Sequence, residues 1–180
     1  MRILFLAATD FELDAARRAW AGSPAVFCVG GWGSEATLRA LEPLLAQAPA
    51  FDRVVDIGIA GSYGPLLPVG AVVHVTAEQN GDRPGVLLNN PAPWSALSFL
   101  PETAGNTVQE LDARWRQVDA GVETMEGAAF FEACLRSGLP FAEIRAVSNL
   151  VGETDHAKWD IPLALKNLES ALRTLHHNLS

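Results

Sequence analysis

The segment 122–152, VETMEGAAFFEACLRSGLPFAEIRAVSNLVG, constrains the fold of this chain more than any other stretch. It reads as an acidic strand end, a helix, a Gly/Pro turn and a second apolar strand. Gly138 and Pro140 are typical of a helix end, because glycine tolerates the left-handed conformation there and proline cannot continue a helix. The run Phe141–Val147 then predicts a strand. The segment is therefore expected to be one αβ unit of an α/β protein.

Polar side chains stand at two positions of this unit. Glu126 falls where Met125 and Glu126 run into the helix-forming GAAFFEACLR, so its carboxylate is expected near a helix N-terminus, which favours negative charge. Ser148 and Asn149 fall at the carboxyl end of the strand, where open α/β sheets bind ligands. The pattern alone is more typical of an ordinary core unit with polar residues at its edge, because fold features do not define a site.

The composition favours a folded protein with a small-molecule ligand. The chain has 180 residues, of which 49% are hydrophobic and 19% charged, so we expect residues 1–180 to form one domain. A net charge of −8 supplies no basic surface and argues against nucleic acid and anionic membranes as partners. Cys28 and Cys134 lie in apolar runs and are typical of core residues in a reducing cytosol.

The N-terminal segment predicts neither a leader nor a membrane span. The apolar run Ile3–Ala8 is followed at once by Asp10, Glu12 and Asp14, which end it too early for either. The histidines are scattered, and none stands at zinc-ligand spacing with a cysteine or carboxylate. We therefore expect a cytoplasmic protein that spans no membrane and binds no metal.

Strand and helix patterns alternate along the chain, which favours the α/β class independently. Strands are predicted at Arg2–Ala8, Ala25–Val29, Val54–Gly61, Val72–Thr76, Gly105–Glu110 and Phe141–Val147, and helices at Glu12–Trp20, Ser34–Gln47 and Ile161–Leu175. The segment 77–101 is rich in turn residues, and 111–118 predicts a short helix or turn. Thr154 is expected to cap the last helix.

Two stretches, VETMEGAAFF and RAVSNLVG, resemble the purine nucleoside phosphorylase and nucleosidase superfamily. Within it, VETMEGAA together with SN in place of SD is most similar to the futalosine hydrolases of menaquinone biosynthesis. The turn GIAG at 58–61 is similar to a Gly-x-Ala-Gly turn of that superfamily, although Ile59 replaces a frequent serine. The resemblance implies a three-layer α/β/α sandwich around a mixed, twisted sheet, and a homo-oligomer of two or more subunits.

The resemblance also implies roles for individual residues. Glu12 follows the first strand and would activate the attacking water, although its position alone is typical of an ordinary first-turn acid. Glu126 would hold the ribose hydroxyls and Asn149 would bind the base. The other substrate-binding residues implied are Thr124, Met125, Ala60, Gly61, Ser148 and Trp159. Trp159 is equally well explained as a tryptophan that packs the last helix onto the core.

Asn149 predicts which base is bound. Its amide NH₂ donates hydrogen bonds, and a 6-oxopurine offers the two acceptors N7 and O6 on one edge. Adenine-specific relatives have an aspartic acid at this position. With the resemblance, this implies cofactor-free hydrolysis of the N-glycosidic bond of futalosine, releasing hypoxanthine.

Three alternatives stay open: a methylthioadenosine/S-adenosylhomocysteine-type nucleosidase, a purine nucleoside phosphorylase, and a nucleoside-binding relative without turnover. Phosphorolysis needs arginines on the phosphate, and neither AATDFE nor GIAGSYG contains one. Arg145 lies in a strand with a buried pattern, so we expect it to be structural or to fix the loops of the site.

Two further questions stay open. The superfamily normally has more residues than this chain between the turn at Val69–Gly70 and Met125–Glu126, and the tryptophans can lie at the surface or in the core. The residue that stacks on the base is open among Trp94, Phe99 and Val108. Trp32, Trp94 and Trp115 are expected at the surface, which is compatible with subunit contacts but also with core packing.

Overall fold

The computed structural model describes residues 1–47, 50–81, 83, 85–111 and 119–179. Its strands are β1 (Ile3–Ala7), β2 (Ala25–Val29), β3 (Arg53–Ser62), β4 (Val72–Asn80), β5 (Leu87–Asn89), β6 (Glu102–Thr107), β7 (Val122–Thr124) and β8 (Phe141–Leu150). Its α-helices are α1 (Asp10–Ala19), α2 (Gly33–Leu45), α3 (Gly127–Ser137) and α4 (Ile161–Asn178). Trp115 and most of the predicted 111–118 element lie outside the described residues.

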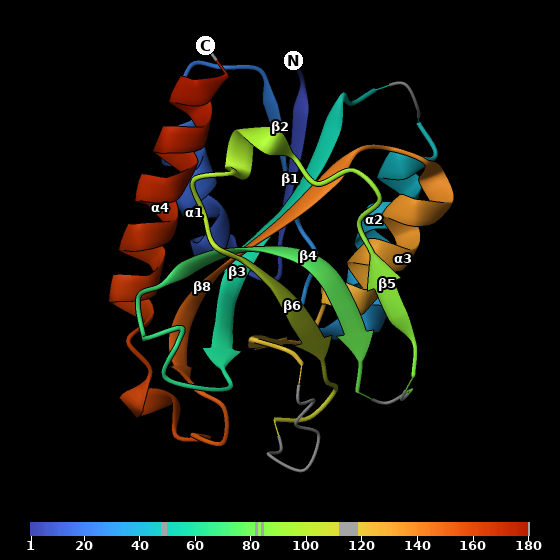
Figure 1. The fold of residues 1–180 in the computed structure, drawn as a ribbon. Helices are drawn as coiled ribbons and strands as arrows, with labels where there is room; N and C mark the ends of the chain where they lie inside the picture. The colour runs from blue at the N-terminus through green and yellow to red at the C-terminus, as the bar shows by residue number, and fades with distance from the viewer. Residues whose placement is uncertain (48–49, 82, 84, 112–118, 180) are drawn as a thin grey trace.

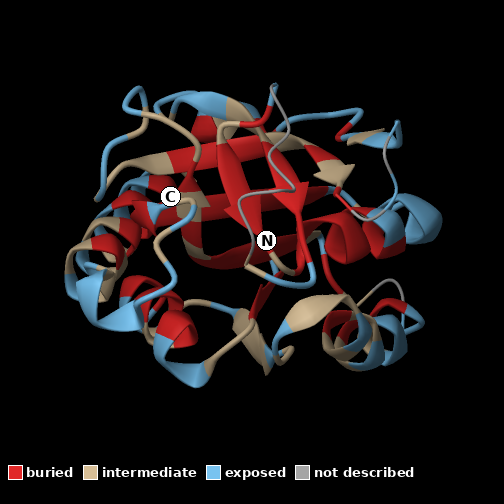
Figure 2. Ribbon diagram, turned by 90° about the horizontal axis from the view of Figure 1, so that it is seen from below, coloured by how far each residue is buried: buried red, intermediate tan, exposed pale blue. Residues whose placement is uncertain are grey.

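The strands form one mixed sheet with helices on both faces (Figure 1). Helices α1 and α4 pack together on one face, and α2 and α3 pack together on the other. Coloured by burial, the sheet is largely buried while the outer sides of the helices are exposed (Figure 2). The predicted three-layer α/β/α sandwich with a mixed sheet is thus confirmed.

The sheet closes on itself in its middle. β3 runs parallel to β8 along most of its length and pairs with β7 through its last two residues. β8 pairs with β4, β4 with β6, and β6 with β7, so these five strands form a ring. The register between β3 and β8 shifts at Ala60/Gly61, which is where β3 also meets β7. That irregularity brings the ends of three strands together.

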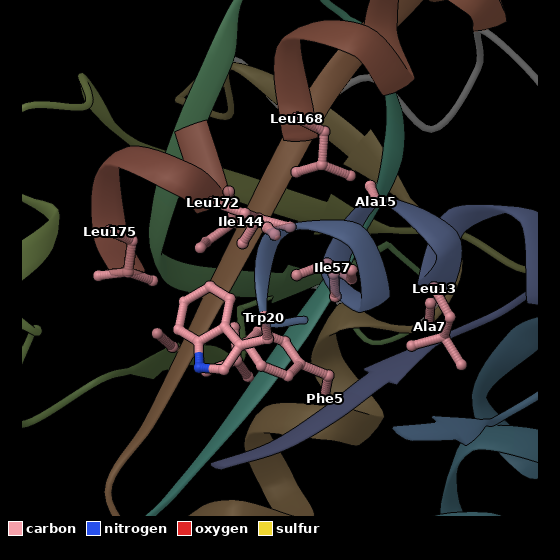
Figure 3. Packing of buried hydrophobic residues seen from close by; sticks show 14 of the residues in the cluster. Phe5, Ala7, Leu13, Ala15, Trp20, Ile57, Ile144, Leu168, Leu172 and Leu175 are labelled. Atoms are coloured by element: carbon pink, nitrogen blue, oxygen red, sulfur yellow. The ribbon is translucent and has the colours of Figure 1, made fainter. Parts of the chain in front are cut away.

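A hydrophobic core fills each side of the sheet. On the α1/α4 side, Phe5 and Trp20 meet edge to face with their ring centroids 4.7 Å apart, and Leu168 of α4 packs into the same cluster (Figure 3). On the α2/α3 side, Phe131 packs edge to face on Phe141 at 4.9 Å. Both helix layers are therefore attached to the sheet by buried aromatic and aliphatic side chains.

Several predicted boundaries were wrong. β4 runs on to Asn80 and a short β5 follows, within a region that was expected to hold only turns. β6 begins at Glu102 rather than Gly105, and its sequence ETAGNT has no apolar pattern that could reveal it. Helix α4 is capped by Asp160, which accepts from Leu163 N at 3.0 Å, and not by Thr154.

Two of the three tryptophans expected at the surface are described. Trp32 is exposed, as predicted. Trp94 is buried instead, because the guanidinium of Arg53 stacks over its ring at 4.3 Å and it packs into the α1/α4-side core. An interior tryptophan covered in this way gains burial and a cation–π contact together.

Truncating Leu168 should test how α4 is attached. Leu168→Ala removes a fully buried side chain and leaves a cavity, so the free energy of unfolding should fall by about 2–5 kcal/mol in urea denaturation. Lys166→Ala changes an exposed residue of the same helix, and its free energy of unfolding should stay within about 0.5 kcal/mol of the wild-type value. Equal effects of the two changes would contradict this packing.

Candidate active site

A cavity lies where β1, β3, β7 and β8 end and α1 and α3 begin. The structure brings all nine residues predicted for the site to its wall: Glu12, Ala60, Gly61, Thr124, Met125, Glu126, Ser148, Asn149 and Trp159. They come from five separate stretches of the chain. Their convergence is a geometric observation, and their roles remain predictions.

Glu12 is buried in the wall and held by three donors. Thr9 donates to its Oε2 through both the backbone N–H, at 3.0 Å, and the hydroxyl, and Ile59 N–H donates to its Oε1 at 3.0 Å. Burial nevertheless dominates and raises the pKa of the Glu12 carboxyl, while these bonds and the charge of Arg145 act in the opposite direction. A carboxylate with a raised pKa is a better proton acceptor near neutral pH.

Glu126 occupies the N-cap position of α3. Its Oε1 accepts from Gly33 N at 2.9 Å, and its Oε2 accepts from Met125 N at 3.3 Å. The glycine-rich turn after β2 therefore holds this carboxylate through the backbone. Each carboxylate oxygen can accept more than one hydrogen bond, so Glu126 can still accept from a ligand.

Ser148 and Asn149 lie within the last residues of β8. The sequence had predicted that the strand ends at Val147, just before them. Ser148 Oγ donates to Asn149 Oδ1 at 2.8 Å, and Asn149 Nδ2 donates to Leu150 O at 3.0 Å. The serine thereby occupies the acceptor end of the amide. The NH₂ group has a second hydrogen left to donate to a ligand.

The strand β3 forms the wall between these groups. Its residue Gly61 is in register with Asn149 on one side and with Glu123 on the other, and a Cβ at Gly61 would come within 3.3 Å of Asn149 Nδ2. A Cβ at Gly58 would overlap the Arg145 guanidinium and lie 2.8 Å from Glu12 Oε1. Glycine at these two positions therefore gives the polar side chains their space.

Arg145 lies behind the cavity, fully buried between two acids. It donates through Nε to Glu143 Oε1 at 2.7 Å and through a terminal nitrogen to Asp56. It does not line the cavity, which agrees with the structural role expected for it. Its positive charge is nevertheless one of the influences on the pKa of Glu12.

Sequence reasoning missed Glu123 and the aromatic rim. Glu123 lines the cavity and accepts from Tyr63 Oη at 2.8 Å. Phe11 and Trp32 also line it and are 45% and 72% exposed, so they lie at its mouth. Glu123 stands within the VETME motif, and this proximity was the available signal. Phe11 and Trp32 carry no sequence pattern that marks them as residues of a cavity.

Trp159 contributes to the wall and to the chain's own packing. Its indole N–H donates to Glu153 O at 2.9 Å, and its ring contacts His156 with centroids 4.2 Å apart. By contrast, Trp94, Phe99 and Val108, the three candidates for stacking on the base, do not line the cavity as described. Within the described residues no cluster of His, Cys, Asp and Glu side chains is arranged to hold a metal. The described helices also include none long and apolar enough to span a membrane.

Comparisons with known proteins identify similar sequences and a similar fold. A model of the phosphorylase superfamily matches residues 92–178. The chain is 35% identical to a futalosine hydrolase of Streptomyces coelicolor over 130 residues, which cover 71% of this chain but 49% of that protein. It is 30% identical to a futalosine hydrolase of Thermus thermophilus over 185 residues, which cover 86% and 82% of the two chains. The chain thus spans about half the length of the first relative and most of the second.

A solved structure shares the fold. The structure of a 5′-methylthioadenosine/S-adenosylhomocysteine nucleosidase from Colwellia psychrerythraea, in complex with adenine, matches with a TM-score of 0.85. The match covers 99% of this chain and 96% of that chain at 19% sequence identity. At this identity the likeness concerns the architecture.

Replacing Glu12 should change the pH dependence of stability. Because burial raises the carboxyl pKa above its ordinary value of 4.5, the folded protein holds this proton more tightly than the unfolded chain. The stabilising contribution is fully present below pH 4.5 and is lost as the pH rises through the raised pKa of the folded state. Urea denaturation across pH should therefore show wild type losing stability relative to Glu12→Gln as the pH rises.

The control is Glu35→Gln, which makes the same chemical change on the exposed first turn of α2. Its free energy of unfolding should follow that of wild type across the same pH range. Parallel curves for wild type and Glu12→Gln would contradict the burial of an ionisable Glu12.

Proposed function

The chain belongs to the futalosine hydrolase family of the phosphorylase superfamily, and on this basis we propose that it hydrolyses the N-glycosidic bond of futalosine and releases hypoxanthine. The observation that carries the proposal is the convergence of Glu12, Glu126 and Asn149 on one cavity. These residues lie far apart in the chain, and each offers what one part of a purine nucleoside requires.

Asn149 supports recognition of a 6-oxopurine. Its Oδ1 accepts from Ser148 and one hydrogen of its NH₂ goes to Leu150 O, so the second hydrogen can be donated to a ligand. N7 and O6 of hypoxanthine are both acceptors for that hydrogen. A hydrogen bond at N7 stabilises the base as it leaves. Adenine would instead present an amino donor at C6, which an NH₂ group cannot accept.

The two acids support hydrolysis at the sugar. Glu126 can accept from ribose hydroxyls, and its negative charge stabilises the oxocarbenium-like sugar of the transition state. Glu12 accepts the proton of the attacking water, a role favoured by its raised pKa. No cofactor enters this chemistry.

Water is favoured over phosphate as the nucleophile. Among the described residues that line the cavity there is no arginine or lysine, and His156 is the one basic side chain. A phosphate dianion beside Glu12, Glu123 and Glu126 would meet repulsion without an arginine to offset it.

The mouth of the cavity offers a place for the remainder of futalosine, which is an inosine extended at its 5′ carbon by an aromatic group. Exposed Phe11 and Trp32 supply apolar faces there. We propose further that the enzyme acts in the cytoplasm, in menaquinone biosynthesis, as a homo-oligomer. Family membership supports the pathway, and exposed apolar side chains such as Leu66 and Leu150 support the assembly.

Hypoxanthine release from futalosine, followed with xanthine oxidase, tests the activity. Glu12→Gln should lower kcat/KM by about 10²–10⁴-fold, because it removes the proton acceptor. Asp14→Asn, on the same helix and outside the cavity, should leave the rate unchanged.

Other outcomes would replace the proposal. Release of adenine from methylthioadenosine without release from futalosine would favour the related nucleosidase activity. A rate that depends on phosphate would favour a phosphorylase. Tight binding of hypoxanthine with no turnover in the wild type would favour a nucleoside-binding protein.

Changing Asn149 should shift the preference between bases. In Asn149→Asp the carboxylate can no longer donate to N7 or O6, so the transition state for futalosine should lose about 1–3 kcal/mol of stabilisation and kcat/KM should fall about 5- to 150-fold. The ratio of kcat/KM for adenosine to that for inosine should rise. Asn178→Asp, at the exposed end of α4, should leave both values unchanged. An unaltered ratio in Asn149→Asp would contradict base recognition by Asn149.

A further inference from the structure

Glu78 is a fully buried acid that the proposed chemistry does not use. It lies in β4, has no exposed surface and does not line the cavity. Burying a carboxyl group this completely is costly unless its oxygens are hydrogen-bonded or it is neutral. Its neighbours therefore indicate what it does.

Two threonines connect Glu78 to the start of α3. Thr107 Oγ1 donates to Glu78 Oε2 at 2.8 Å, and Thr124 Oγ1 lies 3.4 Å from Glu78 Oε1. The same hydroxyls accept from the first amides of the helix: Ala128 N donates to Thr107 Oγ1 at 2.7 Å and Gly127 N to Thr124 Oγ1 at 3.3 Å. These amides immediately follow Glu126, so the network holds the residue at the N-cap.

The backbone approaches Glu78 closely at two glycines. A Cβ added at Gly105 or at Gly127 would overlap Glu78 Oε1. The carboxyl group thus lies directly against the backbone of β6 and against the first residue of α3. A side chain with this fit sets the distance between the two elements.

On its other side Glu78 lies beside the ion pairs of Arg145, within hydrogen-bonding reach of the Glu143 carboxyl group. Glu143 Oε1 accepts from Arg145, whereas Glu143 Oε2 is buried and accepts no hydrogen bond from the described residues. A proton carried by Glu78 would supply the missing donor. Arg145 already faces the two acids Asp56 and Glu143, so a third ionised carboxyl beside them would be uncompensated. Burial and the charge of Glu143 accordingly hold the pKa of Glu78 well above its usual range.

We propose that Glu78 is a positioning residue that works as a neutral carboxylic acid, donating to Glu143 and accepting from Thr107 and Thr124. It thereby joins the Arg145 cluster to the first turn of α3. Arg145 adjoins Glu12 across Gly58, and the first turn of α3 follows Glu126. Glu78 thus fixes both acids of the site relative to each other. The inference rests on the proposed function for its kinetic consequence only.

The charged and titratable groups around this network come from every element packed against it. They are Glu12 of α1, Asp56 and Tyr63 of β3, Glu123 of β7, Glu126 and Cys134 of α3, and Glu143 and Arg145 of β8. Loss of the link should let Arg145 move away from Glu12. Since the charge of Arg145 lowers the pKa of Glu12, movement of Arg145 away from Glu12 should raise that pKa.

Two variants distinguish the hydrogen bonds of a neutral side chain from the effects of side-chain size and of charge: Glu78→Gln and Glu78→Ala. Gln keeps the size, the neutrality and a donor for Glu143, although its NH₂ replaces one of the two oxygens that accept from the threonines. We therefore expect kcat/KM for futalosine to stay within about tenfold of wild type, and the acid limb of its pH profile to stay in place. Ala removes all three, and misplacement of the catalytic acids should lower kcat by about 10²-fold, with KM less affected. The acid limb should also move to higher pH in Glu78→Ala, which a purely structural loss would not cause.

Infrared spectroscopy at neutral pH tests the protonation directly. The wild type should show a carboxylic-acid C=O band that disappears in Glu78→Gln, whether or not the protein hydrolyses futalosine. If Glu78→Ala does not fold, Thr107→Val keeps the volume, removes the hydroxyl between Glu78 and Ala128, and should show the same loss of kcat.

Three results would overturn the inference: a Gln variant as impaired as the Ala variant, an Ala variant with wild-type kcat and pH profile, or no difference between the infrared spectra. Absence of hydrolysis by the wild type would instead remove the proposed function. The infrared result would then still decide the protonation of Glu78.

Discussion

The site depends on the burial of one positive charge. The guanidinium of Arg145 lies in the interior between Asp56 and Glu143. Its ion pair with Asp56 joins β8 to β3 in addition to their backbone ladder, and its ion pair with Glu143 lies within β8. A buried pair of this kind adds little net stability, yet removing one partner leaves an uncompensated charge and costs several kcal/mol. Such a cluster therefore tolerates few alternative arrangements. It holds the backbone around Gly58 where Glu12 can lie beside it, and the other polar groups of the cavity follow from that position.

Each functional group in the cavity is supported by backbone amides or by a neighbouring side chain. Ile59 N–H holds Glu12, Gly33 N–H holds Glu126, and the Ser148 hydroxyl orients the adjacent amide. A polar group that is already oriented loses less entropy when a ligand binds and can stabilise developing charge without reorganising. The replacement of the frequent serine by Ile59 does not disturb this support, because the bond to Glu12 is made by the backbone.

Sequence patterns predicted the architecture where burial is continuous and failed where it is not. The buried strand β1, predicted at Arg2–Ala8, and the helix ending at Gly138 were found from the sequence, because apolar runs and a left-handed glycine are local signals. β6 was misplaced because it consists of small and polar residues that become buried only when the ring of strands closes. The nine site residues came largely from family resemblance, and their meeting in one cavity depends on strand register, which no local pattern encodes. Glu123 was missed for the same reason, since only its pairing with Gly61 turns it toward the cavity.

The closed ring of β3, β8, β4, β6 and β7 has a mechanical consequence. In an open sheet two neighbouring strands can part by breaking one ladder, whereas widening a ring strains every ladder in it at once. We therefore expect the strands beneath the cavity to form a rigid floor. Entry and exit of ligands must then depend on the segments at the mouth of the cavity, where Phe11 and Trp32 are exposed, and not on separation of the strands.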